Sequence, residues 1–187
     1  MILFLGLVIL NLTSCKGQTS SIEKLNLKDF KFDSYFGCKN DDKNTSYCLL
    51  GQGFFRTTRS TNSDSLLNDW LTKHPNAMVV KVSSLATPEK SNPNLNLIYC
   101  WIIDNADTLN NYLIREGCYP GGTMQRPQTW EEMSSKEKEF YEDTDKPQVT
   151  VHIDKKTYDN FIKQIKVAET YAQNNKLGIW AKTEDKE

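Results

Sequence analysis

Short runs of apolar residues in the first half of the chain predict a set of strands. Residues 27–56 are rich in Phe, Tyr, Thr and Leu, and the polar stretch 39–44 interrupts them, which predicts a strand, a turn and a second strand. Residues 77–82 (AMVVKV) and 97–103 (LIYCWII) are nearly continuous apolar runs, which are typical of buried strands. Between them, residues 86–96 contain two prolines and three asparagines and are expected to form a loop.

Three other stretches have the periodicity of amphipathic helices. Residues 62–73 begin with the helix-start signal Asn-Ser-Asp and then place apolar side chains at helical spacing. Residues 105–116 predict a second helix, which Gly117 ends, and residues 154–175 a third and longer one. An alternating strand is predicted at 149–153. The apolar faces of the first and third helices consist of Leu66, Leu67, Trp70, Leu71, Tyr158, Phe161, Ile165, Ala168 and Ala172.

A long polar connection, about residues 119–147, separates the second helix from that last strand. It contains one predicted short helix around 134–141, and a connection of this length is usually functional or an added subdomain. Trp130, Phe140 and Tyr141 lie within it among many acidic residues. Such a stretch either presents a protein-binding surface or uses its aromatic side chains to hold the insertion against the domain.

The first fourteen residues have the pattern of a secretion signal. Residues 1–12 (MILFLGLVILNL) are almost wholly apolar but fall short of the roughly 20 residues that span a bilayer. The segment Leu-Thr-Ser-Cys that ends at Cys15 resembles the lipobox of bacterial lipoproteins, whose cysteine is acylated as the signal is removed. We therefore expect a lipid on Cys15, a tether over residues 15–26 and attachment to a membrane. Lys16, where some bacteria use Asp as an inner-membrane sorting signal, favours the outer membrane.

Charge and length limit what the mature chain can be. Without its first fourteen residues the 187-residue chain keeps 173, a size typical of one domain with a substantial core. Its 23 Lys and Arg residues nearly balance 24 Asp and Glu residues. This balance argues against a dedicated nucleic-acid binder. The expected partners are the membrane, through the lipid anchor, and an unidentified protein or other component of the envelope, with nucleic acid as the less favoured alternative.

Four cysteines remain after Cys15, and an even number in an exported protein suggests two disulfides. We favour the pair Cys38–Cys48, because the polar stretch between them has the composition of a hairpin loop. Cys100–Cys118 would then be the second pair. A zinc site is the competing interpretation, but the sequence has no C-x-x-C pair, and its two histidines lack ligand-like spacing. No metal site is therefore expected from these residues.

The order of several motifs resembles that of staphylococcal-nuclease-like (thermonuclease) domains. Residues 97–117 (LIYCWIIDNADTLNNYLIREG) contain a strand, an acidic turn and the helix pattern N-x-x-L-I-R-x-G, and Ala168-Glu169 and residues 177–180 (LGIW) follow. The resemblance implies an α+β fold, mainly an OB-like five-stranded β-barrel with a helix between strands and a long C-terminal helix. The domain would cover residues 27–182, with the insertion at about 119–147.

The same resemblance implies Ca²⁺-dependent phosphodiester hydrolysis, for which carboxylates hold the cation and two arginines neutralise the phosphate. Arg115, in the helix pattern, occupies the position of one of these arginines. The family's R-x-x-x-x-D-x-P-E run corresponds here to residues 54–66 (FFRTTRSTNSDSL), which keep Arg56 and Arg59 but lack D-x-P-E. The chain therefore lacks the expected Ca²⁺ ligands.

Three functions follow from these observations. The first is a lipid-anchored envelope protein whose degenerate, non-catalytic nuclease-like domain acts as a binding or interaction module, with no cofactor. The second is an active Ca²⁺-dependent nuclease in which Arg115 is catalytic and the carboxylates come from other positions. The third is an unrelated small α+β envelope lipoprotein of the inhibitor or immunity type.

Overall fold

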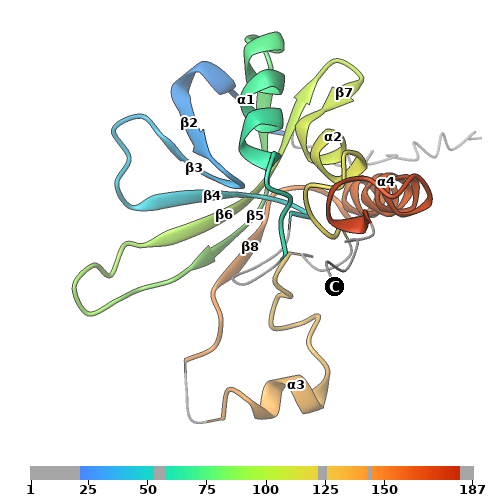
Figure 1. Cartoon of the computed structure of the whole chain (residues 1–187). Helices are drawn as coiled ribbons and strands as arrows, with labels where there is room; N and C mark the ends of the chain where they lie inside the picture. The colour runs from blue at the N-terminus through green and yellow to red at the C-terminus, as the bar shows by residue number, and fades with distance from the viewer. Residues whose placement is uncertain (1–21, 53–57, 122–125, 143–144, 182–187) are drawn as a thin grey trace, which may run out of the picture.

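A curled mixed sheet, in the form of a half-barrel, is the body of the protein (Figure 1). The computed structural model describes residues 22–52, 58–121, 126–142 and 145–181. The predicted signal, Cys15, most of the predicted tether and Arg56 lie outside these residues. Within them lie eight strands and four α-helices in an α+β arrangement, which confirms the predicted α+β class, while the five-stranded barrel stays a prediction.

The sheet is built around an antiparallel pair, β5 and β6, and β4 lies parallel to β6 on its other side. A meander, β2–β3–β4, extends that side. On the free edge of β5, its first half pairs with β1 and its second half with β8, and a β-bulge between Lys81 and Ser83 separates the halves. The strands are β1 (Lys24–Asn26), β2 (Phe30–Asp33), β3 (Phe36–Lys39), β4 (Thr45–Leu49), β5 (Met78–Ala86), β6 (Asn96–Asp104), β7 (Asp107–Thr108) and β8 (Val149–Val151).

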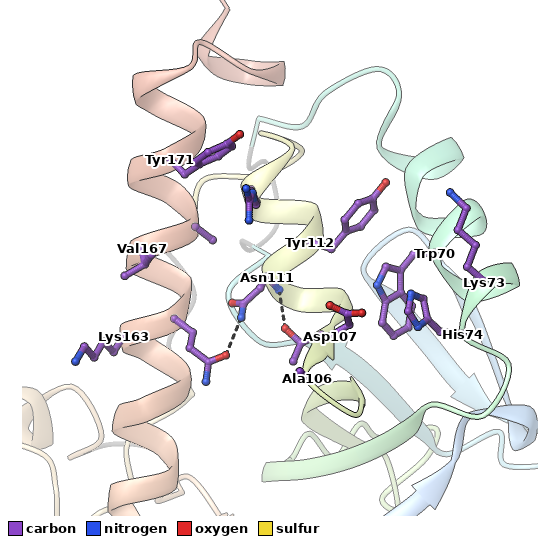
Figure 2. Close-up of a pocket in the computed structure, with 14 residues that line it drawn as sticks. Trp70, Lys73, His74, Ala106, Asp107, Asn111, Tyr112, Lys163, Val167 and Tyr171 are labelled. Atoms are coloured by element: carbon purple, nitrogen blue, oxygen red, sulfur yellow. Dashed lines mark hydrogen bonds between the residues drawn. The ribbon is translucent and has the colours of Figure 1, made fainter.

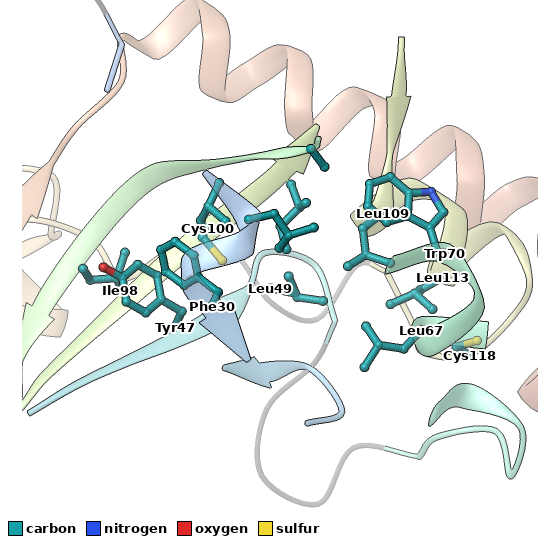
Figure 3. Packing of buried hydrophobic residues seen from close by; sticks show 14 of the residues in the cluster. Phe30, Tyr47, Leu49, Leu67, Trp70, Ile98, Cys100, Leu109, Leu113 and Cys118 are labelled. Atoms are coloured by element: carbon teal, nitrogen blue, oxygen red, sulfur yellow. The ribbon is translucent and has the colours of Figure 1, made fainter. Parts of the chain in front are cut away.

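Both faces of the central strands are buried, which explains their continuous apolar runs. Along β6, Ile98, Cys100 and Ile102 belong to one hydrophobic cluster, whereas Tyr99 and Trp101 belong to another. Because side chains alternate across a strand, the two clusters lie on opposite faces of the sheet. Figure 3 shows the first cluster, which α1 and α2 cover. The second cluster is covered by α4. The ring of Phe161, on this helix, stacks on the ring of Trp101 with 4.3 Å between the ring centroids.

The helices lie close to where periodicity places them. Helix α2 is shorter than predicted, because Asn105, at φ +53°, turns the chain back and lets β7 pair with the end of β6. The side chain of Thr108 then caps α2 by accepting from the backbone N–H of Asn111. In α3, Ser134 and Glu137 form a capping box. The helices are α1 (Ser63–Lys73), α2 (Leu109–Arg115), α3 (Ser135–Glu139) and α4 (Lys155–Asn174), with short 3₁₀ segments η1 (Leu27–Asp29) and η2 (Gly178–Trp180).

The region before α1 contains more strands than the pattern of residues 27–56 predicts. A tight turn at Ser34, with φ +59°, divides the first predicted strand into β2 and β3. The sequence offers no Gly or Asn at this turn, so the hairpin was not predicted. The polar turn at 39–44 is confirmed, since β3 ends at Lys39 and β4 begins at Thr45.

A fully buried amide, Asn110 at the start of α2, joins three elements of the core. Its Nδ2 donates to the carbonyl oxygens of Leu50, at 2.8 Å, and of Cys100, at 3.2 Å. Its Oδ1 accepts from the backbone N–H of Ile102 at 3.0 Å. All polar atoms of this side chain are therefore paired, and Asn110 fixes α2 against β6 and the end of β4.

Candidate functional site

A groove of about 610 Å³ runs across α2, between α1 on one side and α4 on the other (Figure 2). Because α2 has only two turns and is wedged between two longer helices, its outer face forms the floor of the groove. The residues that line it are Trp70, Lys73, His74, Ala106, Asp107, Thr108, Asn111, Tyr112, Arg115, Lys163, Gln164, Val167, Ala168 and Tyr171.

The walls of the groove are largely apolar. On the α1 side, Trp70 is buried and stacks on His74 at 4.1 Å between ring centroids. The Nδ1 of His74 lies 2.9 Å from a carboxylate oxygen of Asp104, which ties the end of α1 to the end of β6. On the α4 side, Val167 and Tyr171 are exposed, at 64% and 40%. The groove therefore presents apolar surface to solvent, a feature of interaction sites.

Three cationic side chains line the same groove. Arg115 is exposed at the end of α2, and its guanidinium carbon lies 4.1 Å from the centre of the Tyr171 ring. This cation–π contact orients the guanidinium while its N–H groups remain available to an anion. Lys73 and Lys163 supply the other two charges, and Asp107 is the one carboxylate of the described lining. The groove is therefore suited to an anionic group attached to an apolar one.

The floor of the groove holds an amide with an unused acceptor. Asn111 donates through Nδ2 to Oε1 of Gln164 on α4, at 2.8 Å. Its Oδ1 is buried and has no hydrogen-bond partner among the described residues. A buried acceptor without a donor is costly, so a bound molecule that brings an N–H here would be stabilised.

The structure places the two described arginines of the predicted catalytic set in different surroundings. Arg59 donates to Oγ of Ser34 at 2.8 Å and lies 3.5 Å from a carboxylate oxygen of Asp64, in the first turn of α1. Arg115 instead faces the groove over Tyr171. Within the described ranges no three His, Cys, Asp or Glu side chains are grouped so that they could hold a metal ion. No helix in that part of the chain has the length and apolarity needed to cross a bilayer.

Neither predicted disulfide is formed in the structure, where all four cysteines are free thiols. On the β3–β4 ladder the partner of Cys38 is Ser46, so Cys48 is a diagonal neighbour. Diagonal residues lie about 7–8 Å apart, beyond the usual Cα separation in a disulfide. Cys100 and Cys118 share one hydrophobic cluster, but Figure 3 shows them at separate places in it.

Alkylation tests this arrangement of thiols. Burial raises the pKa of Cys48 and of Cys118 to about 12 and raises that of Cys100 well above its ordinary value. Because the thiolate is the reactive form, we expect iodoacetamide at pH 8 to modify only the exposed Cys38 in folded protein that starts at Ser20 and so lacks Cys15. All four should react after unfolding without reductant, as counted by mass spectrometry. An unreactive Cys38 in the unfolded, unreduced protein would instead restore the Cys38–Cys48 bridge.

The sequence of α4 contains a signal for this groove, in two large apolar residues outside its predicted apolar face. The predicted apolar face of α4 was confirmed, with Ile165, Ala168 and Ala172 buried. Val167 and Tyr171 lie off that face, and large apolar residues on the polar side of an amphipathic helix indicate a second contact surface.

Comparison with known proteins adds no family to these observations. No protein-family model matches the chain, and no curated protein matches it in sequence.

Proposed function

We propose that this chain is a lipid-anchored protein of the cell envelope whose domain binds a partner through the groove and performs no catalysis. The observation that carries the proposal is the composition of the groove. Its described lining contains exposed apolar side chains, three cationic side chains and a single carboxylate. Phosphodiester hydrolysis with Ca²⁺ needs several oxygen ligands close together, which this lining does not offer.

We further propose that the half-barrel is an OB-like five-stranded barrel of the thermonuclease kind. In support, the path of the sheet begins at β1 and ends at β2, and only the short segment η1 separates these strands in the chain. One continuous segment thus pairs with β5 at its start and with β3 at its end. The parallel pair β4–β6 and the position of α1 between β4 and β5 also suit this topology.

The residues of the helix pattern N-x-x-L-I-R-x-G then have structural roles. Asn110 joins α2 to the sheet, Leu113 and Ile114 are buried, and Gly117 packs against the segment that contains LGIW. Arg115 is the member that points to solvent. Folding therefore explains the fixed residues of the pattern other than Arg115, which lines the groove.

A nuclease assay separates the module from the enzyme. We expect protein that starts at Ser20 to leave DNA and RNA intact with Ca²⁺, at the same level as with a chelator and as in Arg115→Ala. Arg59→Ala is the matched control at the arginine outside the groove. Ca²⁺-dependent cleavage that Arg115→Ala abolishes would make the protein an enzyme and overturn the proposal.

A further inference from the structure

Large apolar side chains are exposed on two surfaces of this protein. The four most exposed in the described chain are Phe140 at 77%, Val167 at 64%, Tyr171 at 40% and Val151 at 37%. Val167 and Tyr171 line the groove, whereas Phe140 lies at the end of α3 in the long connection before β8. The three most exposed of these side chains therefore belong to the groove and to this connection. We call residues 126–142 of the connection the arm.

Contacts within the arm and at its base hold it in place and leave the side chain of Phe140 exposed. Its base is fixed by Arg126, which pairs with Glu132 through both nitrogens and lies over the ring of Tyr158 at 4.9 Å. The guanidinium of Arg126 lowers the pKa of Glu132 to about 2, so the pair stays charged at neutral pH. Further out, Trp130 contacts Tyr141 edge to face at 6.2 Å. Trp130 and Tyr141 thus pack against each other within the arm, whereas Phe140 remains exposed.

The charges of the two surfaces are complementary. The arm carries five carboxylates and three cationic side chains, and Phe140 is flanked by the exposed carboxylates of Glu139 and Glu142, with Lys136 and Lys138 preceding it in α3. In the groove, the exposed apolar side chains lie beside Lys73, Arg115 and Lys163. A second hollow on α4 adjoins the groove at Lys163 and Val167 and adds Lys166 together with the carboxylate of Asp159. An acidic segment with one projecting aromatic ring thus matches a cationic groove with apolar walls.

We propose that the arm of one copy of this protein docks, through Phe140, into the groove of a second copy. Figure 1 shows α3 projecting from the sheet, away from α1 and α2, so the arm meets the groove of a neighbour and not its own. The inference rests on the proposed function, because it names the partner of the same groove. The unused Oδ1 of Asn111 favours a peptide, which supplies N–H donors, over a phosphodiester, which supplies acceptors only.

Attachment to a membrane would allow copies of the protein to associate even if the contact between arm and groove is weak. Lipid anchors would hold many copies at one surface, which raises their effective concentration toward one another. Because arm and groove are different patches of the molecule, the contact is heterologous and each copy brings both halves of it.

Sedimentation of protein that starts at Ser20, which lacks both the predicted signal and the predicted lipid anchor, tests the proposal. We expect its average mass to rise between about 10 and 500 μM, as mass action requires for self-association. Phe140→Ser should weaken association by roughly tenfold or more, as loss of a central apolar anchor does. Val151→Thr, at the exposed apolar residue outside both surfaces, is the matched control and should have no effect.

Exchanging a negative charge of the arm with a positive charge of the groove tests the contact even if a single substitution disturbs the structure of the arm. Glu139→Arg and Arg115→Glu should each weaken association, and the two together in one chain should restore it. A constant monomer mass over this range, or association that these changes leave untouched, would overturn the inference. Binding of a dodecamer of thymidylate at the groove, lost in Arg115→Glu and with no self-association, would assign the groove to nucleic acid and also overturn it. A monomer whose groove still crosslinks to another envelope protein would overturn the inference but leave the proposed function standing.

Discussion

Gly117→Ala is expected to lower the free energy of unfolding by about 3 kcal/mol, through a left-handed backbone penalty of about 1–2 kcal/mol and an overpacking cost of similar size. Gly117 has φ +70°, and a Cβ there would lie 2.1 Å from the carbonyl oxygen of Leu177. That oxygen is backbone and has no side-chain freedom to move away. The change would push η2 from α2 and break the hydrogen bond from Ile179 N–H to Gly117 O, at 2.9 Å. Urea denaturation should show a lower midpoint with an unchanged slope.

The control is a substitution in the same region that should raise the free energy of unfolding instead of lowering it. Helix α4 ends in a Schellman arrangement, with Leu177 N–H donating to Ala172 O and Lys176 N–H to Gln173 O. Lys176 occupies the left-handed position at φ +51°, where glycine is the usual residue. Lys176→Gly should therefore raise the free energy of unfolding by roughly 0.5 kcal/mol. If Gly117→Ala were as stable as the native protein, the close packing of η2 on α2 would be wrong.

Cys15→Ala is expected to move the protein from the membrane fraction to the soluble fraction of the envelope or to leave an unprocessed precursor. The thiol of Cys15 is the atom that would carry the lipid, and alanine offers no replacement. Because each buried CH₂ of an acyl chain contributes about 0.8 kcal/mol, losing the chains removes nearly all membrane affinity. Cell fractionation and the intact mass of the native protein, which should include the lipid, measure both effects.

The matched control for this experiment is Cys38→Ala. Cys38 is the exposed thiol of the folded domain, so its loss should leave membrane attachment unchanged. A Cys15→Ala variant that loses residues 1–14 and still remains in the membrane fraction, or a native protein whose intact mass includes no lipid, would contradict lipid anchoring at this residue.

Local sequence patterns were sufficient for most of the fold. The apolar runs of β5 and β6 and the periodicity of α1 and α4 predicted these elements because burial dictates both patterns. The turn at Ser34 and the late start of α2 could not be predicted, because each depends on a non-glycine residue held at positive φ by its surroundings. Tertiary contacts there override the local preference of the chain.

The candidate site was predicted only in part. Arg115 was identified from a motif, but its environment depends on Tyr171, which lies 56 residues further along the chain. The groove likewise combines side chains from α1, α2 and α4, so no local pattern contains it. The resemblance to nucleases drew on the residues of α2, which form the floor of the groove, while its catalytic expectation depended on carboxylates that the described residues do not bring together.

Photo-crosslinking from the groove of the lipidated, full-length protein in intact cells tests the central claim most directly. A photoreactive phenylalanine at Val167, which is exposed in the groove, should form a discrete crosslinked product that Arg115→Glu removes. The same group at Lys90, exposed in the loop between β5 and β6, should form none. Equal crosslinking from both positions, or no product from position 167, would contradict the conclusion that this groove is the binding site of an envelope module.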